Sequence, residues 1–276
     1  MVGIEEQVDR FLREDIGSGD LTALIIPEKS QAGATVMTRQ KMIVCGQAWF
    51  NAVFRSLDKH IEIEWLVEEG EWVDAGIQLC TLSGAARGLL TGERTALNIL
   101  QTLSAVATES WQYSRAVVGT NCQILDTRKT LPGLRLAQKY AVKCGGCLNH
   151  RVGLYDGILI KENHIIAAGS ISTAVSRARL ISSVVVVEVE VENQDELREA
   201  VAARPDRIML DNFSLEEMRE AVAWVAGRIP LEASGDVTLE TLYTIARTGV
   251  DFISVGALTK HISAIDLSMR IAVVDS

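Results

Sequence analysis

Basic side chains gather in one stretch of an otherwise acidic chain. Between Asp126 and His164 seven Lys or Arg residues face only three acidic ones, whereas the 276 residues together carry a formal net charge of -9. Guanidinium groups bind carboxylates through paired hydrogen bonds, and ammonium groups add point charges. The stretch therefore predicts a site for a small molecule with several negative charges. Its most suggestive residues are Asp126-Thr127-Arg128-Lys129, Asn149-His150-Arg151 and Ile160-Lys161.

Some of these basic residues have a second interpretation. Arg135, Lys139 and Lys143 recur at helical spacing, so we expect them to form a solvated helix face. Lys161 by itself could be a Schiff-base lysine of an aldolase-like barrel. His150 could be a structural histidine, which we also expect for His164.

Six short apolar runs, each ending in charged or small polar residues, are expected to position this chemistry. Apolar runs that alternate with helical patterns are typical of parallel strands covered by helices. The carboxyl ends of such strands meet on one face of a barrel. Because there are six clear strands rather than eight, we predict an α/β barrel that is an incomplete TIM-like barrel. The runs are Ile124–Leu125, Ile158–Ile160, Val184–Glu190, Ile208–Leu210, Leu231–Ala233 and Phe252–Val255.

The first hundred residues follow a different pattern. An amphipathic opening precedes alternating stretches, and Val67–Leu79 resembles the hairpin rhythm of hammerhead, lipoyl-like sandwiches. No lysine occupies its turns, which argues against covalent lipoyl or biotinyl attachment. We predict an α+β open sandwich, hammerhead-like N-terminal domain over 1–108, including a bridging helix Gly92–Thr108, and a barrel over 109–276. Packing of the C-terminal segment back on the first domain is kept as an alternative.

Composition excludes several classes of partner. The acidic balance without a basic tail argues against nucleic acid, and no apolar run reaches the ~20 residues that span a membrane. Five cysteines without a secretion signal predict reduced thiols in the cytoplasm. Cys144-Gly145-Gly146-Cys147 lacks a second ligand pair for zinc and follows a helix, so a metal or redox role is disfavoured.

Ordered motifs along nearly the whole chain resemble quinolinate phosphoribosyltransferase, the decarboxylating nicotinate-nucleotide pyrophosphorylase. They include the basic run described above, Glu14–Thr22, Gly92–Asn98, Leu231–Gly235 and Ser254–Thr259. The resemblance implies transfer of phosphoribose from 5-phosphoribosyl-1-pyrophosphate (PRPP) to quinolinate with decarboxylation, as in NAD biosynthesis. It also implies Mg²⁺ bound with PRPP and a homodimer, or a higher homo-oligomer, with shared sites.

The resemblance also assigns roles to residues of this chain. Lys129, Lys161, Glu190 and Asp211 would be catalytic, and Glu190 and Asp211 would also hold the metal. The substrates would be bound by a larger set, in which Arg94 comes from a second subunit. That set is Arg94, Thr127, Arg128, His150, Arg151, Ser234, Gly235, Asp236, Gly256 and Ala257.

Three residues depart from the family pattern. Asp236 replaces a second glycine and puts the phosphate contact there in doubt, Cys147 replaces a glycine, and His261 replaces a small residue. Two other functions stay open: a molybdenum-associated paralogue of the same fold, and a non-catalytic barrel that binds a phosphorylated metabolite. The first should differ in its strand-end motifs, and the second has no need of Glu190 and Asp211 together with the lysines.

Overall fold

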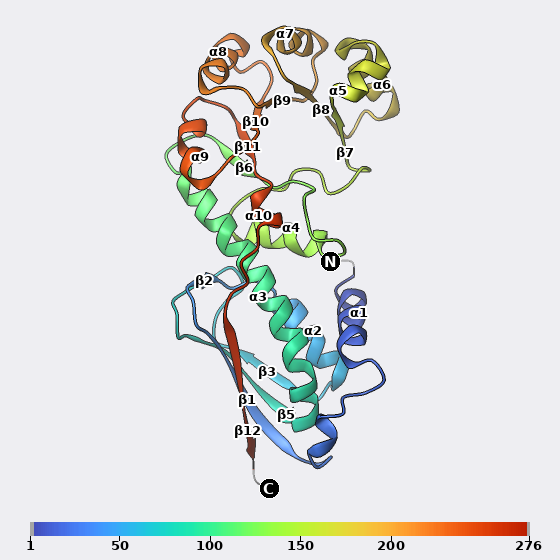
Figure 1. Cartoon of the computed structure of the whole chain (residues 1–276), viewed down its shortest axis with the longest axis vertical. Helices are drawn as coiled ribbons and strands as arrows, with labels where there is room; N and C mark the ends of the chain where they lie inside the picture. Colours follow the sequence, from blue (N-terminus) through green and yellow to red (C-terminus); the bar gives the residue numbers. More distant parts are fainter. Residues whose placement is uncertain (1–2, 275–276) are drawn as a thin grey trace. The chain divides into compact units, whose positions relative to one another are not determined.

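The structure is a computed structural model that describes residues 3–274. These residues form two compact units, 3–109 together with 262–274, and 110–261 (Figure 1). Helix α3 (Ala86–Ala116) starts in the first unit and ends in the second. It contains the expected helix Gly92–Thr108 and extends it at both ends.

The first unit is built on an antiparallel sheet with strand order β12-β1-β5-β3. Strand β1 (Gln31–Thr38) alternates exposed or half-buried with buried residues, so one face of it packs in the core. Strand β12 pairs with all eight residues of β1, and the C-terminal residues from 262 onward therefore lie with this unit. The other strands are β2 (Met42–Ile43), β3 (Glu62–Trp65), β4 (Trp72–Val73), β5 (Gln78–Ala85) and β12 (Leu267–Val274).

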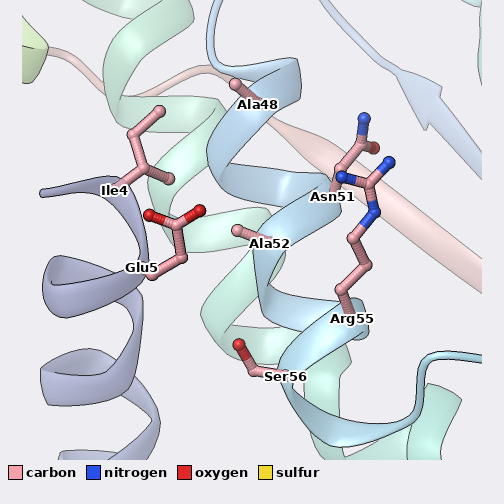
Figure 2. Close-up of a pocket in the computed structure, with 7 residues that line it drawn as sticks. All are labelled: Ile4, Glu5, Ala48, Asn51, Ala52, Arg55 and Ser56. Carbon is pink, nitrogen blue, oxygen red and sulfur yellow. The ribbon is translucent and has the colours of Figure 1, made fainter. Parts of the chain in front are cut away.

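Two helices of the first unit enclose a hollow. Helix α1 (Ile4–Ile16) packs beside α2 (Gln47–Leu57), and a short 3-10 turn follows α1 at Ala23–Ile25. Figure 2 shows Glu5 of α1 and Arg55 of α2 at this hollow. None of the residues that line it belongs to the predicted site. The lining residues are Ile4, Glu5, Ala48, Asn51, Ala52, Arg55 and Ser56.

The second unit is an open α/β barrel. Its parallel sheet has six strands in the order β6-β11-β10-β9-β8-β7; the ends do not join, which confirms the predicted incomplete barrel. Each strand contains or overlaps a predicted run. The strands are β6 (Gln123–Leu125), β7 (Gly157–Ile160), β8 (Val186–Val191), β9 (Arg207–Asp211), β10 (Leu231–Ser234) and β11 (Phe252–Ser254).

A helix follows most strands of the barrel sheet. Helices α6, α7 and α8 lie side by side on the outer side of this sheet (Figure 1). The spacing of apolar residues in the sequence predicts helices over Asp195–Ala203, Leu215–Val225 and Leu239–Ala246. Helices α8 and α9 have the predicted bounds, and α7 begins one residue earlier than Asp195. Helices α5 and α6, which share the connection between β7 and β8, had no clear sequence signal. The helices are α4 (Arg135–Cys144), α5 (Glu162–Ala168), α6 (Ile171–Ile181), α7 (Gln194–Ala203), α8 (Leu215–Val225), α9 (Leu239–Ala246) and α10 (Ala257–Lys260).

The two faces of the barrel sheet differ in polarity. Residues paired across neighbouring strands share a face, and successive residues alternate. Val187, Val189 and Ile208 are fully buried on one face, which suits the side covered by helices. The register places Glu188 with Arg207, and Asp211 with Ser234, on the opposite face. One face of the sheet is therefore apolar, and charged side chains of several strands lie on the other face.

No helix in the described part of the chain is both long enough and apolar enough to cross a membrane.

Candidate active site

The loop after β6 and the connection before β7 bring Arg128 and Arg151 within electrostatic range of each other. Burial and the neighbouring charge of Arg128 both lower the pKa of Arg151. The Nε atom of Arg128 is buried and has no hydrogen-bond partner within residues 3–274, while Arg151 donates one hydrogen bond, 3.1 Å long, to the carbonyl of Gly157. Two adjacent guanidiniums repel each other and are costly to desolvate. An anion placed between them would relieve both penalties.

A second group combines a lysine with two carboxylates. The ammonium of Lys161, directly after β7, forms an ion pair with Glu190 on β8. Asp211, the last residue of the neighbouring strand β9, accepts a 3.0 Å hydrogen bond from the side chain of Asn212. Glu190 pairs with Met209, and Asp211 lies two residues after Met209 on β9. Glu190 and Asp211 therefore lie on the same face of the sheet. The carboxylates are half-buried, as ligands of a partly hydrated cation would be.

The surroundings of Lys161 do not suit a Schiff-base lysine. Such lysines are activated by an apolar pocket or by a neighbouring cation. Its side chain is 47% exposed and its neighbour is a carboxylate.

The loops after β6 and β11 lie against each other. A Cβ atom added to Gly256 would come 2.9 Å from Cδ of Lys129 and 3.5 Å from Oγ1 of Thr127. Thr259 donates a 2.8 Å hydrogen bond to the carbonyl of Lys129. The absence of a side chain at Gly256 is therefore what lets Lys129 lie over this loop, next to backbone that a phosphate could approach.

The loop after β10 also depends on a glycine. Gly235 has a φ of 113°, and a Cβ there would collide with the Asn212 side chain. Asp236 follows with a φ of 37°, in the left-handed region that favours glycine. Its side chain is exposed, so an acidic group stands at the edge of this loop.

Two family models together match most of the chain. The family model described as "Quinolinate phosphoribosyl transferase, C-terminal domain" matches residues 106–270, and the corresponding N-terminal domain model matches 20–104. The chain belongs to the quinolinate phosphoribosyl transferase family.

Relatives in this family match nearly the whole chain. The "Probable nicotinate-nucleotide pyrophosphorylase [carboxylating]" of Bacillus subtilis is 40% identical over 269 residues, covering 97% of this chain and 93% of the relative. The protein of the same description from Synechocystis is 40% identical over 272 residues, covering 97% and 92%. The solved structure of nicotinate-nucleotide pyrophosphorylase from Francisella tularensis shares 49% identity and a TM-score of 0.95, covering 98% and 96% of the two chains.

A buried ion pair between Lys139 and Asp126 holds the Asn149-His150-Arg151 segment in place through hydrogen bonds. Lys139 of α4 is 2% exposed and forms an ion pair with the fully buried Asp126. Lys139 also donates to the carbonyl of His150 (3.1 Å), and Asp126 accepts from the backbone N–H of His150 (2.9 Å). Asn149 donates to Asp126 at 2.7 Å. Burial raises the pKa of Asp126 and lowers that of Lys139, while their contact acts in the opposite direction on both.

The expected solvated face of Arg135, Lys139 and Lys143 is therefore wrong for two of its members. Arg135 is half-buried and donates to Thr130 and to the carbonyl of Val152. Lys143 alone is exposed. Helical spacing cannot distinguish these cases, because the partner of Lys139, Asp126, lies outside the helix, directly after β6.

His150 contacts two buried carboxylates. Its Nε2 lies 2.7 Å from Glu188 and 3.7 Å from Glu232, both nearly inaccessible to solvent. Burial raises the pKa of Glu188, and it raises that of Glu232 to about 7 with help from Glu188. Burial lowers the pKa of His150. Alternation along Glu188–Glu192 predicts that Glu188, Glu190 and Glu192 share one side and that at least one of them is only an ion-pair partner. Glu188 is such a residue, but its partner His150 has no signal in the sequence.

Four further residues singled out in the sequence lie at element ends or on α3. Ser234 ends β10, and Ala257 begins α10 after Gly256. Arg94 is an exposed residue of α3 and belongs to the first unit, whereas the other proposed site residues belong to the second. His164 accepts from the backbone of Lys161 at the start of α5, the structural role expected for it.

Cys147 does not suit redox chemistry. It is buried, its thiol donates to the carbonyl of Ser110, and burial raises its pKa to about 12. A thiol with so high a pKa is a poor nucleophile and metal ligand.

Proposed function

We propose that this chain transfers the phosphoribosyl group of PRPP to quinolinate with loss of CO₂, giving nicotinate mononucleotide and pyrophosphate. The observation that carries the proposal is the adjacent Arg128 and Arg151, of which Arg128 retains a buried, unpartnered donor. Such a pair suits the two neighbouring carboxylates of quinolinate. The names of the relatives, at about 40% identity over almost the full chain, support the same activity.

The two substrates are assigned to neighbouring groups of side chains. Arg128, Arg151, His150 and Lys161 hold the dicarboxylate, with Arg94 of a second copy. Thr127 and Lys129 face the donor, and the glycine-rich loops at Ser234, Gly235, Asp236, Gly256 and Ala257 hold its 5′-phosphate. Backbone N–H groups can approach phosphate closely where the loop residue is glycine.

The half-buried carboxylates of Glu190 and Asp211 fit Mg²⁺, a hard cation that prefers oxygen ligands and retains water. When bound with PRPP, Mg²⁺ neutralises charge on the departing pyrophosphate. Glu190 and Asp211 also face the ribose, whose anomeric carbon becomes positive as its bond to pyrophosphate breaks, and their charge stabilises that carbon. Lys129 and Lys161 stabilise the leaving group.

The ring nitrogen then forms the bond to the anomeric carbon and becomes quaternary. The electron pair of the breaking bond to the adjacent carboxylate is accepted by this cationic ring, CO₂ leaves, and a proton replaces it. Arg128 and Arg151 orient the dicarboxylate so that its nitrogen faces the donor.

A product assay tests the proposal. Purified protein is incubated with quinolinate, PRPP and Mg²⁺, and we expect nicotinate mononucleotide, CO₂ and pyrophosphate in equal amounts, with loss of turnover after chelation and recovery with Mg²⁺. Nicotinate in place of quinolinate should react far more slowly, because it lacks one carboxylate. PRPP binding without product would instead support a non-catalytic phosphometabolite barrel and overturn the proposal.

A further inference from the structure

A buried glutamine joins two of the proposed substrate loops. Gln138 lies on α4 and is inaccessible to solvent. Its Oε1 accepts a 2.7 Å hydrogen bond from the backbone N–H of Leu131, and its Nε2 donates a 2.9 Å hydrogen bond to the carbonyl of Thr259. Leu131 follows the loop that carries Lys129, and Thr259 belongs to α10, which begins directly after Gly256. One side chain therefore holds both loops against α4.

A buried hydroxyl joins the same two loops to each other. Thr259 is also inaccessible to solvent, and its Oγ1 donates a 2.8 Å hydrogen bond to the carbonyl of Lys129. The backbone N–H of Lys129 donates a 3.1 Å hydrogen bond to Oγ1 of Thr127. The backbone of Lys129 is therefore held on both sides. Its side chain lies against Gly256, where an added Cβ atom would come 2.9 Å from Cδ of the lysine.

Helix α4 holds the segment of Arg151 through a different side chain. Arg135, the first residue of this helix, donates a 3.0 Å hydrogen bond to Oγ1 of Thr130 and a 3.3 Å hydrogen bond to the carbonyl of Val152. The backbone N–H of Val152 in turn donates to Asp156 at 2.7 Å. The residue directly after Arg151 is thus fixed through both of its backbone polar groups. The donor loops and the arginine segment therefore depend on different residues of α4.

A purely structural role is the competing explanation for Gln138 and Thr259. Gln138 completes the turn before α4, and Thr259 fills buried space. The two explanations differ in what they require of Thr259. Packing needs the shape and the methyl group of the side chain, whereas positioning of Lys129 needs its hydroxyl donor. Valine keeps the shape without the donor, and serine keeps the donor without the methyl group.

We propose that Gln138 and Thr259 are positioning residues for the phosphoribosyl donor: together they fix the backbone of Lys129 over the loop at Gly256, so that its ammonium meets the pyrophosphate of PRPP. The inference rests on the proposed function and deepens it. In it, α4 serves the donor through Gln138 and the dicarboxylate through Arg135. Variants of a single helix should therefore affect the two substrates separately.

Kinetics of matched variants test the proposal. Thr259→Val removes the donor to Lys129, so we expect the KM for PRPP to rise roughly fivefold, as for one lost hydrogen bond, and the KM for quinolinate to change by less than about twofold. Thr259→Ser keeps the donor and should stay within about twofold of wild type for both substrates. An unchanged KM for PRPP in Thr259→Val, equal changes in both KM values, or a loss in Thr259→Ser as large as in Thr259→Val would overturn the proposal.

Two variants of α4 extend the test. Gln138→Met loses both hydrogen bonds of the glutamine and should raise the KM for PRPP at least as much as Thr259→Val does. Gln123→Met, at the exposed first residue of β6, is its control and should behave as wild type. Arg135→Met should instead raise the KM for quinolinate, because it releases the carbonyl of Val152. The same pattern of losses in Gln138→Met and Arg135→Met would contradict the division of α4 between the substrates.

A binding experiment is independent of turnover. Calorimetric titration with pyrophosphate and Mg²⁺ should give a Kd that is roughly fivefold higher for Thr259→Val than for the wild type, with Thr259→Ser close to the wild type. If the wild type makes no product but shows this pattern, the proposed function fails and the positioning of Lys129 stands. If product forms but Thr259→Val binds pyrophosphate as the wild type does, the positioning inference alone is wrong. A wild type that does not bind pyrophosphate would overturn it as well.

Discussion

At the scale of single residues, the proposed site depends on two arginines that form no ion pair within residues 3–274, although Glu188 and Asp156 act on Arg151 electrostatically. Arg128 and Arg151 lie close enough to lower the pKa of Arg151, yet Lys161 and Lys139 nearby each have a carboxylate partner. The difference supports the proposal that the arginines bind the anionic substrate, whereas Lys139 is part of the scaffold. A cation without a buried partner is costly unless a ligand supplies the charge.

Arg151→Ala should therefore weaken quinolinate binding selectively. Loss of charge-assisted hydrogen bonds should cost about 1.5–3 kcal/mol, which is a rise in KM of at least tenfold. The KM for PRPP should change little. Steady-state kinetics with each substrate varied in turn measures both. Arg219→Ala, the same change on exposed α8, is the control, and equal losses for the two substrates would argue against the assigned role.

Asp236 is one of the three expected departures from the family pattern, and its backbone also lies in the left-handed region. Its φ of 37° favours glycine, so Asp236→Gly should raise the free energy of unfolding by about 0.5–1 kcal/mol. Removing a carboxylate from the phosphate loop should also lower the KM for PRPP.

Arg204→Gly separates these two effects. Arg204 also has a left-handed φ, 55°, but it ends α7 away from the phosphate loop. Chemical denaturation should show stabilisation in both variants, and only Asp236→Gly should change the KM for PRPP. A raised KM in Asp236→Gly would mean that the carboxylate assists donor binding.

At the scale of elements, the barrel strands carry a titratable layer as well as the substrate-binding ends. Glu232 on β10 faces Glu188 of β8, Arg207 of β9, Ser254 of β11 and His150 from the loop before β7. Its pKa rises from 4.5 to about 7, mainly because burial disfavours the charged form. The folded protein therefore holds this proton more tightly than the unfolded chain does.

The sign of the resulting pH dependence follows from linkage. Glu232 favours folding most below pH 4.5, and this contribution is lost as the pH rises through about 7. Glu232→Gln cannot titrate, so its free energy of unfolding, relative to wild type, should increase by more than about 1 kcal/mol between pH 4.5 and 7.5. Denaturation at several pH values measures the difference, and parallel curves for the two proteins would contradict it.

At the scale of the whole molecule, the proposed site needs Arg94 from another copy. Arg94 is exposed on α3 in the first unit, whereas the other proposed site residues belong to the second unit. A two-fold dimer is the simplest closed assembly in which each copy completes the site of the other.

Mixing two inactive variants tests this arrangement. Arg94→Ala and Lys161→Ala damage different parts of the shared site, so a mixed dimer should contain one site with both residues intact. If exchange is random, activity should recover to roughly a quarter of the wild-type value, since about half the dimers are mixed and have one good site. Tagged copurification verifies mixed dimers, and their inactivity would refute the sharing of sites.

The sequence by itself determined the fold class and the chemistry of the strand ends. Apolar runs of strand length and helices between them are local patterns, so the six strands and the exact bounds of α8 could be predicted. Arg128, Lys129 and Lys161 lie within a few residues after β6 or β7, and parallel strands bring such positions together whatever the details of packing. Arg151 lies in the connection before β7, so its position required the structure.

Only the tertiary structure decided which charges are paired. Lys139 and Asp126 lie 13 residues apart and His150 and Glu232 82 apart, and no periodicity links them. The layer of Glu188, Arg207 and Glu232 arises from strand register, which depends on how neighbouring strands align. The return of β12 to β1 is likewise a pairing between the two ends of the chain. Contacts between distant segments depend on the packing of the whole unit, and single-sequence patterns record only what lies within a turn or a strand.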